Sequence, residues 1–280
     1  MTDLWVETKY PEYADEAGQL AQQLGLSFRM SEEVELSEYR EVTIRPRREA
    51  SGAGRSKEEK GADGLCLQLG PRGLALRKGD LELLGDLSEM LPRVRGRMWQ
   101  HEPLARAGKL KNPPEVWKAW DATAGLGEDS MILAAAGYQV TMYEQNPVIA
   151  ALLRDALRRA QGSDDAELRT ITRRMKLICA DSTEAMRKLA GKAAPTILYL
   201  DPMFPARQKS GLIKKKFQLL QLLESPEADE EAMLSAALRV GAARVVIKRP
   251  AKGPWMAGRK PDFSYPGTSI RYDCFSGKET

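Results

Sequence analysis

Apolar runs and amphipathic stretches alternate along the chain from about Trp117 onward. The apolar runs have the length of buried strands, and the stretches between them repeat apolar residues at the spacing of a helix. We predict five strands here: Val116–Asp121, Gln139–Glu144, Lys176–Cys179, Thr196–Leu200 and Arg244–Lys248. Strands that alternate with helices indicate an α/β fold, with a mostly parallel central sheet covered by helices.

Asn146 and Pro147 predict the start of a helix between the second and third strands. An Asn side chain can cap a helix, and Pro suits the first helical position because its missing N–H needs no partner there. The apolar positions that follow share one helical face: Val148, Ile149, Leu152, Leu153, Ala156 and Leu157. This face is expected to cover the sheet.

The first ninety residues predict a small α/β unit of their own. Its expected elements are a strand at Leu4–Thr8, a helix at Pro11–Leu24, and a hairpin of Leu65–Leu69 with Leu74–Arg77 around Gly70 to Gly73. The stretch from Arg47 to Gly64 has almost nothing apolar, which predicts a mobile loop. We therefore divide the chain into an N-terminal region, 1–90, and a larger domain, 91–280.

The composition indicates a globular protein, since 42% of the 280 residues are hydrophobic and 29% are charged. No apolar run approaches a membrane span, and the start of the chain lacks the basic and apolar regions of a signal peptide. We expect a cytoplasmic protein. Cys66, Cys179 and Cys274 are far apart and His101 is the lone histidine, so no metal site is expected.

The segment from Asp121 to Asp129 passes from the end of the first strand into a helix and contains Gly125 and Gly127. Small residues let the backbone turn tightly and let a ligand lie against it. A triphosphate loop is excluded because no Gly-Lys-Ser/Thr follows, and Ser130 stands where a dinucleotide fingerprint has its third glycine. A purely structural turn remains an alternative.

Glu144 ends the second strand about 19 residues after Gly125, where an acid can accept both hydroxyls of a ribose. Asp181 and Ser182 follow the third strand, where this fold class meets an adenine edge, although a helix cap explains them equally well. Together with Asp121 and the glycine turn, these acids are typical of S-adenosylmethionine (SAM), whose amine and ribose need acceptors. The sequence thus predicts a Rossmann-like class I methyltransferase.

The segment from Leu198 to Pro205 resembles the Asn/Asp-Pro-Pro-Tyr/Phe signature of enzymes that methylate exocyclic amines of nucleobases, with Met203 in place of the second proline. An aryl amine is a poor nucleophile because its lone pair is delocalised into the ring. Acceptors on Asp201 and on the Pro202 carbonyl can hold the amino hydrogens and orient the lone pair. Phe204 can stack on the base. We therefore expect Asp201, Pro202 and Phe204 to be catalytic.

The net charge is only +4, but the positive charge is concentrated in three runs. They are Arg93–Lys118 with seven Lys or Arg, Pro205–Phe217 with five and Arg244–Lys260 with six. Because these runs flank the candidate site, they favour contacts with nucleic-acid phosphates over a merely solvated face. The expected RNA-binding residues are Lys209, Lys214, Lys215, Lys216, Lys248 and Arg249.

From about Leu104 to the C-terminus, the chain resembles the bacterial small-subunit ribosomal RNA guanine-N2 methyltransferases of the RsmJ (YhiQ) type. The resemblance rests mainly on Asp-Ala-Thr-Ala-Gly-Leu-Gly at 121–127 and Leu-Asp-Pro-Met-Phe-Pro at 200–205, with the closing Arg271-Tyr272-Asp273. It implies cofactor contacts by Glu128, Asp129, Glu144, Gln145, Asp181, Ser182 and Asp201. Glu128 and Gln145 stand where the family usually has arginines.

The resemblance implies methyl transfer from SAM to the N2 amine of a guanosine in small-subunit ribosomal RNA, with the RNA or the ribosomal subunit as partner. Two alternatives remain open from the residues. The same Asp-Pro-x-Phe geometry serves an N6-adenine or another planar-amine methyltransferase, and the basic runs would also suit a non-catalytic RNA-binding assembly factor.

Overall fold

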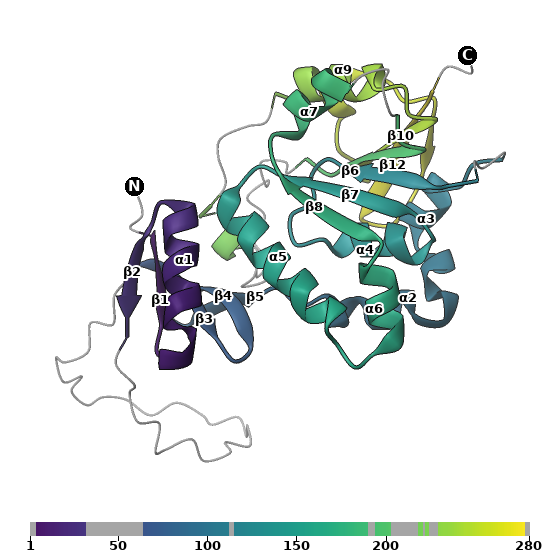
Figure 1. The fold of residues 1–280 in the computed structure, drawn as a ribbon. Helices are drawn as coiled ribbons and strands as arrows, with labels where there is room; N and C mark the ends of the chain where they lie inside the picture. The colour runs from purple at the N-terminus through teal and green to yellow at the C-terminus, as the bar shows by residue number, and fades with distance from the viewer. Residues whose placement is uncertain are drawn as a thin grey trace, which may run out of the picture.

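A computed structural model describes residues 4–31, 64–111, 115–189, 194–202, 218–220, 222–223 and 229–277. Two β-sheets organise them, one of five strands near the N-terminus and one of seven strands in the rest of the chain. Figure 1 shows two neighbouring bodies, the smaller sheet with helix α1 and the larger sheet covered by helices. The α/β class predicted from the sequence is confirmed.

The larger sheet contains the predicted strands and two more. Its strands are β6 (Lys118–Asp121), β7 (Gln139–Glu144), β8 (Met175–Cys179), β9 (Ile197–Leu200), β10 (Arg244–Pro250), β11 (Phe263–Tyr265) and β12 (Ile270–Ser276). Strands β8, β7, β6, β9 and β10 run parallel in this order, whereas β12 is antiparallel to both of its neighbours, β10 and β11. The chain therefore reverses its direction of strand addition between β6 and β9, where α/β sheets bind ligands.

Helices cover both faces of this sheet (Figure 1). On one face lie α2 (Leu91–Val94), α3 (Pro103–Gly108), α4 (Glu128–Ala135), α5 (Pro147–Gln161) and α6 (Ala166–Thr172), and on the other lie α7 (Ser182–Leu189) and α9 (Glu230–Arg239). Strand β9 alternates between two cores, because Ile197 and Tyr199 belong to the first and Leu198 and Leu200 to the second. A side-chain period of two along a strand buried on both faces explains this division.

Helix α5 begins as predicted. The Asn146 side chain accepts hydrogen bonds from the backbone N–H groups of Val148 and Ile149, and Pro147 opens the helix. The apolar positions of α5 serve two cores, since Ile149 packs with the N-terminal sheet while Leu153 packs with the large one. The helix thus lies between the two sheets, which explains why its apolar face is so wide.

The N-terminal unit is a five-stranded sheet with strand order β2-β1-β3-β4-β5. Its elements are β1 (Leu4–Thr8), α1 (Ala14–Leu24), β2 (Ser27–Met30), β3 (Leu65–Gly70), β4 (Gly73–Lys78) and β5 (Leu81–Leu84). The predicted first strand and the hairpin are confirmed. The helix begins three residues later than predicted, because Pro11–Tyr13 forms a 3-10 turn. The predicted mobile loop lies outside the described residues, apart from Gly64 at its end.

Asp155 of α5 ties the N-terminal sheet to the large body. One carboxylate oxygen accepts a hydrogen bond from the backbone N–H of Leu74 at 3.0 Å and another from Arg159 at 2.8 Å. Arg159 also donates to the Gly85 carbonyl. We propose that the boundary between the two parts lies near Gly85, because Leu87 already packs in the core of the large sheet.

Among the helices that the structure describes, none combines the length and the apolar character that a membrane span needs.

Candidate active site

The predicted site residues gather at the carboxyl edge of the large sheet. Asp121 ends β6, Glu144 ends β7, and Asp201 directly follows β9. Since β7, β6 and β9 are neighbours and parallel, their carboxyl ends meet at one edge. The strand order also reverses at this edge, and open α/β sheets bind ligands in the crevice at such a point. Motifs that are far apart in the sequence therefore meet at the expected ligand position.

The turn after β6 requires its two glycines. Gly125 and Gly127 have φ angles of +53° and +80°, a region that residues with a Cβ rarely adopt. At Gly127 a Cβ would also lie 2.8 Å from the Leu153 side chain, whereas nothing lies within 4 Å of the Cβ position at Gly125. The turn thus packs closely on α5 at one glycine and stays open at the other, as a ligand-binding turn would need.

Asp121 supports this turn from beneath. Its side chain is buried, and its two oxygens accept hydrogen bonds from the Ser130 hydroxyl at 2.5 Å and from the Thr123 backbone N–H at 3.1 Å. Burial raises the pKa of Asp121 to about 7, although both hydrogen bonds oppose the rise. The carboxylate is therefore turned toward the protein, which disfavours the direct cofactor contact expected from the sequence.

Glu144 connects the glycine turn to the start of α5. One carboxylate oxygen accepts a hydrogen bond from the Gly125 N–H at 3.0 Å, and the other accepts one from the Asn146 N–H at 2.8 Å. Burial raises the pKa of Glu144, and these backbone hydrogen bonds hold the rise back. The Gln145 backbone N–H also donates to this carboxylate. A carboxylate has about four lone-pair positions, so the group can still accept a hydroxyl donor from a ligand.

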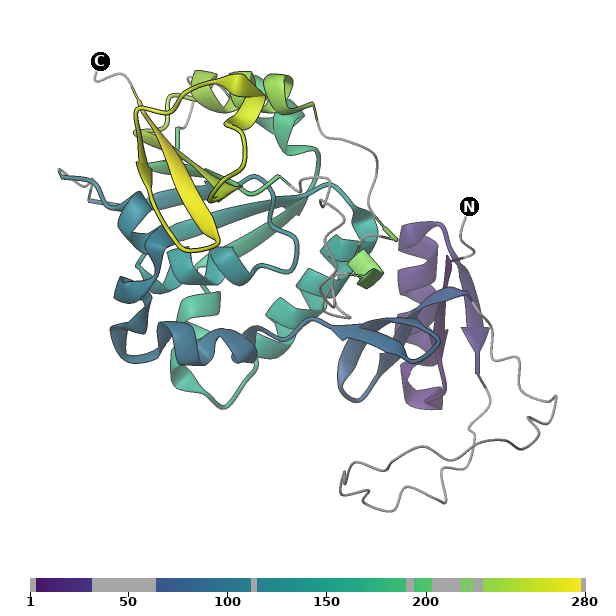
Figure 2. The same cartoon turned by 180° about the vertical axis from the view of Figure 1, so that it is seen from behind.

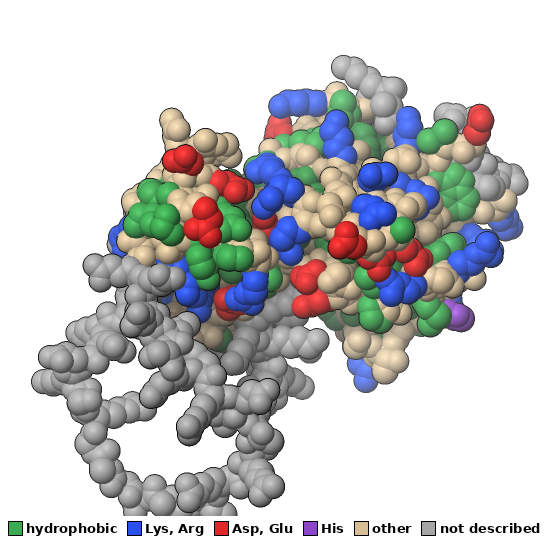
Figure 3. All heavy atoms as spheres, turned by 60° about the horizontal axis from the view of Figure 1, so that its bottom comes forward, with side chains coloured by type: hydrophobic (Ala, Val, Ile, Leu, Met, Phe, Trp, Pro, Cys, Tyr) green, Lys and Arg blue, Asp and Glu red, His purple; other side chains and the backbone are tan. Residues whose placement is uncertain are grey.

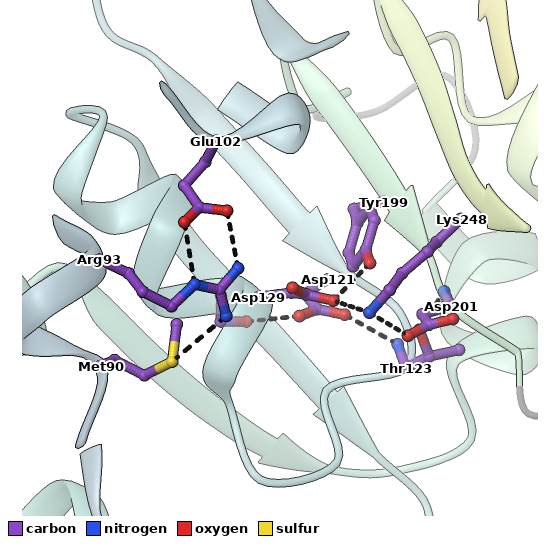
Figure 4. A network of polar contacts seen from close by, with 10 residues as sticks. Met90, Arg93, Glu102, Asp121, Thr123, Asp129, Tyr199, Asp201 and Lys248 are labelled. Atoms are coloured by element: carbon purple, nitrogen blue, oxygen red, sulfur yellow. Dashed lines mark hydrogen bonds and ion pairs between the residues drawn. The ribbon is translucent and has the colours of Figure 1, made fainter. Parts of the chain in front are cut away.

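Lys248 joins two carboxylates at the centre of the site (Figure 4). Its Nζ lies 2.8 Å from an oxygen of Asp129 and 2.8 Å from an oxygen of Asp201. The Tyr199 hydroxyl donates to the same Asp129 oxygen at 2.6 Å. One cation and one hydroxyl from the sheet thus tie the start of α4 to the segment after β9.

Burial and neighbouring charges shift the pKa values of Asp201 and Lys248. Burial raises the pKa of Asp201, and the nearby charge of Lys248 partly lowers it again. Burial alone would lower the pKa of Lys248, but Asp129 and Asp201 outweigh that effect and raise it. Lys248 is therefore a permanent cation near neutral pH, and its charge favours the ionised form of Asp201.

Thr123 links the glycine turn to the Asp-Pro segment. Its hydroxyl oxygen accepts a hydrogen bond from the Asp201 N–H at 2.6 Å, while its own N–H donates to Asp121 (Figure 4). Two motifs that lie 78 residues apart in the chain are thereby fixed relative to each other. Thr123 lies within the motif at 121–127, but its role as a link between the two motifs is visible only in the fold.

The family described as "Putative SAM-dependent methyltransferase" has a model that matches residues 57–277 of this chain. The chain belongs to this family. Its fold is similar to the crystal structure of a SAM-dependent methyltransferase from Neisseria gonorrhoeae, with a TM-score of 0.68 and 27% sequence identity. That alignment covers 100% of this chain and 97% of the other. The predicted class I methyltransferase fold and the SAM cofactor are confirmed by these matches.

Two bacterial relatives carry the name "Ribosomal RNA small subunit methyltransferase J". The protein from Pseudomonas aeruginosa is 47% identical over 158 residues, which are 56% of this chain and 59% of the relative. The protein from Thioalkalivibrio sulfidiphilus is 43% identical over 174 residues, 62% of this chain and 67% of the relative. The match therefore spans about 59% of the length of the first relative. The resemblance stated from the sequence motifs is confirmed by these relatives.

The chemistry of the site fits SAM. The cofactor carries an amine, two ribose hydroxyls and a sulfonium, which are all groups that acceptors and negative charge favour. Glu144 and Asp129 supply carboxylates beside an open glycine turn, and Gln145 is exposed next to Glu144. Asp181 is exposed and caps α7 by accepting hydrogen bonds from the N–H groups of Thr183 and Glu184. The helix-cap alternative is thus confirmed, and a contact of Asp181 with the adenine of SAM stays a prediction.

The remaining predicted cofactor residues lie around this centre. Glu128 is partly buried at the start of α4, and Ser182 is buried at the start of α7. Pro202 is buried directly after Asp201. In the parts of the chain that the structure describes, no group of three His, Cys, Asp or Glu could hold a metal ion.

Two predicted RNA-binding residues need correction. Arg249 is 2% exposed and pairs with Glu230 at 2.9 Å, so its guanidinium cannot reach a phosphate of a bound RNA. Lys248 is held by Asp129 and Asp201 and belongs to the site itself. The two neighbouring side chains point to opposite faces of β10, and both faces are covered by the protein. Some predicted residues lie outside the described part of the chain: the catalytic candidate Phe204 and the RNA-binding candidates Lys209, Lys214, Lys215 and Lys216.

Tyr199 and the inward role of Lys248 were missed from the sequence. A lysine that continues the apolar strand Val245 to Ile247 is a signal for a buried charge in need of carboxylate partners. Tyr199 precedes the Asp-Pro segment by two residues on a fully buried strand, where its hydroxyl must find a partner. Both signals were present in the sequence, but neither one identifies Asp129 as that partner.

Proposed function

We propose that this chain transfers the methyl group of SAM to the exocyclic N2 amine of a guanosine in small-subunit ribosomal RNA. The observation that carries the proposal is the position of Asp201 after β9, with a carboxylate oxygen 2.8 Å from Lys248 and close to Asp129 at the glycine turn. The name of the relatives, ribosomal RNA small subunit methyltransferase J, supports the RNA substrate. The cytoplasmic location, where ribosomal subunits occur, is part of this proposal.

SAM supplies an electrophilic methyl group when it is bound. Glu144 accepts hydrogen bonds from the ribose hydroxyls, while Gln145, Glu128, Asp129, Asp181 and Ser182 complete the cofactor contacts, with Gly125 and Gly127 giving the close approach. The hydroxyls and amine of SAM need acceptors, which these carboxylate, amide and hydroxyl groups supply.

Asp201 is the catalytic residue of the proposed reaction. Its carboxylate accepts one hydrogen of the guanine amine, and the Pro202 carbonyl accepts the other, which orients the nitrogen lone pair toward the methyl carbon. The methylated nitrogen carries a positive charge until it loses a proton, and Asp201 takes that proton. A new N–C bond thus replaces the S–C bond of the cofactor, and the products are N2-methylguanosine and S-adenosylhomocysteine. Phe204 remains the predicted stacking partner of the base.

Lys248 is a positioning residue in this scheme. It carries a fixed positive charge beside Asp201, which favours the ionised carboxylate before methyl transfer and partly offsets the rise in its pKa that burial causes. Tyr199 and Thr123 act similarly, because they fix Asp129 and the Asp201 backbone.

Single-turnover methylation of small-subunit RNA or subunits, followed by nucleoside analysis, tests the proposal. The expected product is N2-methylguanosine. Asp201→Ala should lower the rate about ten- to a hundredfold at saturating RNA, because a charge-assisted hydrogen bond is worth about 1.5–3 kcal/mol. Asp164→Ala, a change at an exposed carboxylate after α5, serves as the matched control.

The outcomes separate the proposal from its alternatives. N6-methyladenosine as the product would replace the guanine assignment and leave amine methylation standing. Cofactor or RNA binding without any methylated nucleoside would favour the non-catalytic assembly factor. A wild-type rate in Asp201→Ala would reduce the Asp-Pro segment to a turn.

A further inference from the structure

Residues 251–260 make up most of the connection from β10 to β11 and follow directly after the strand that carries Lys248. We call this segment the Trp255 loop. Because β10 is parallel to β9, this loop starts at the same carboxyl edge as Asp201. The loop therefore leaves the sheet on the side of the proposed site. In Figure 2 the loop belongs to the yellow-green part of the chain, beside the strand pair that closes the sheet.

Arg271 of β12 fixes the first half of the Trp255 loop. Its guanidinium donates hydrogen bonds to the carbonyl oxygens of Pro250, Ala251 and Gly253 at 2.8, 3.1 and 2.9 Å. Asp273 holds the same guanidinium from the other side through two hydrogen bonds, at 2.9 and 3.0 Å. The Arg271 guanidinium thus binds the backbone of the turn to strand β12.

Arg249 and Glu230 fix the second half. Arg249 donates to the Pro254 carbonyl at 3.0 Å and pairs with Glu230, whose other oxygen accepts the Ala257 N–H at 3.0 Å. Ala257 has a φ of +49°, which is rare for a residue with a Cβ and persists only where the surroundings enforce it. The buried Met256 side chain completes the anchor. Two buried or half-buried arginines therefore hold the loop in one shape.

This rigid loop turns an aromatic ring and several cations outward. Trp255 is 42% exposed, and Lys252, Arg259 and Lys260 are exposed as well. No acidic residue interrupts the sequence from Arg244 to Pro261. On the face that Figure 3 shows, cations and acids both occur, and Arg95, for example, pairs with Asp165.

An exposed aromatic ring among exposed cations is typical of surfaces that bind single-stranded nucleic acid. The acids beside the loop are already engaged, since Glu230 pairs with Arg249 and Asp262 accepts a hydrogen bond from the Ser276 N–H. Bases stack on the ring, and the cations contact phosphates along the backbone. A membrane surface would also attract cations and a tryptophan, but the loop begins at the carboxyl edge where Asp201 lies, and this favours a substrate strand. The proposed reaction needs an unstacked guanosine at that edge.

We propose that the Trp255 loop binds the RNA strand next to the target guanosine, with Trp255 stacking on a neighbouring base and Lys252, Arg259 and Lys260 contacting phosphates. The inference rests on the proposed function, because it takes RNA as the substrate. It also assigns Arg249 and Arg271 as positioning residues that pre-shape the loop. The predicted contribution of the Arg244–Lys260 run to RNA binding thereby moves from Lys248 and Arg249 to this loop.

The test measures the affinity of the full chain for a small-subunit RNA fragment without cofactor, over a series of salt concentrations. Trp255→Ala should raise Kd about 5- to 150-fold, the equivalent of one stacked base, while Trp255→Phe should stay within about threefold of wild type. The triple variant Lys252→Ala/Arg259→Ala/Lys260→Ala should lower the slope of log K against log salt by about two.

The matched control is Arg173→Ala/Lys176→Ala/Lys188→Ala, which removes three exposed cations from other surfaces. It should leave the RNA affinity and the salt slope close to wild type. Thermal unfolding and calorimetric titration of SAM accompany each variant, and both should remain unchanged, since the replaced side chains are exposed.

The readouts separate failure of this inference from failure of the proposed function. If wild type forms N2-methylguanosine but the Trp255 and triple variants bind RNA as wild type does, the loop is not an RNA contact and the function stands. Weaker SAM binding in Trp255→Ala, or binding to anionic vesicles with RNA affinity unchanged, would also overturn the inference. If wild type methylates no guanosine, the proposed function fails, whatever the loop variants show.

Discussion

Replacing Lys248 with methionine tests the electrostatic core of the site. Methionine keeps most of the length and apolar volume of the side chain but removes the charge that lies 2.8 Å from both Asp129 and Asp201. Asp201 then has burial and a second carboxylate acting on it without compensation, so its pKa should rise further. A protonated Asp201 is a poorer acceptor for the guanine amine and cannot take its proton.

The structure sets the size of this effect. Two unit charges 2.8 Å apart interact by about 1.5 kcal/mol in water and about 6 kcal/mol at an effective dielectric constant of about 20. The side chains of Lys248 and Asp201 are 24% and 34% exposed, so screening places the value nearer the lower limit. An interaction of about 1.5–3 kcal/mol corresponds to a shift of roughly one to two pKa units.

The assay is the pH dependence of single-turnover methyl transfer at saturating RNA and SAM. Because the protonated form of Asp201 is inactive, the rate falls as pH drops through its pKa, and this acid limb should move upward by about one to two pH units in Lys248→Met. Lys248→Arg keeps the charge and should return the limb toward the wild-type position. Thermal unfolding monitors the fold.

An acid limb at the wild-type pH in Lys248→Met would refute this reasoning, because a lysine that only packs or binds RNA does not alter the titration of Asp201. A uniform loss of rate at every pH, unrescued by arginine, would assign Lys248 a purely structural role instead.

Two further predictions concern carboxylates of the glycine turn. Glu144→Gln should weaken SAM binding about ten- to a hundredfold in calorimetric titration, because one acceptor oxygen and the charge are lost, whereas Glu184→Gln on α7 should not; equal affinities would remove Glu144 from the cofactor site. Asp121→Asn should flatten the pH dependence of stability. Folding raises the pKa of Asp121 from 3.8 to about 7, so the folded state holds the proton longer and stability falls as pH rises between these values. Denaturant unfolding at pH 5 and pH 8 checks this, and an unchanged difference between the two would contradict it.

Local chemistry in the sequence determined much of the fold. The five central strands were predicted to within two residues at each end, because buried parallel strands are short apolar runs between helices. The start of α5 followed from Asn146 and Pro147, since capping depends on neighbouring residues alone. Strands β11 and β12 were missed. In β12, Arg271 and Asp273 interrupt the apolar pattern, and the fold pairs them with each other, with Ser264 and with the carbonyl oxygens of Pro250, Ala251 and Gly253.

The sequence also determined which motifs carry the chemistry. The glycine turn, Glu144 and the Asp-Pro segment could be identified because each is a compact run at the end of a predicted strand. Their convergence followed from the parallel order of the strands, a property of the fold class.

Only the tertiary structure decided what each charge does. Lys248 and Arg249 belong to one basic run in the sequence, yet the structure buries one against Glu230 and places the other between Asp129 and Asp201. The buried Asp121 likewise accepts a hydrogen bond from Ser130, nine residues away in the chain. The partner of a buried charge comes from a strand or helix far away in the chain, and sequence spacing carries no information about that distance. For this reason the elements and motifs were predictable, whereas the pairing of charges was not.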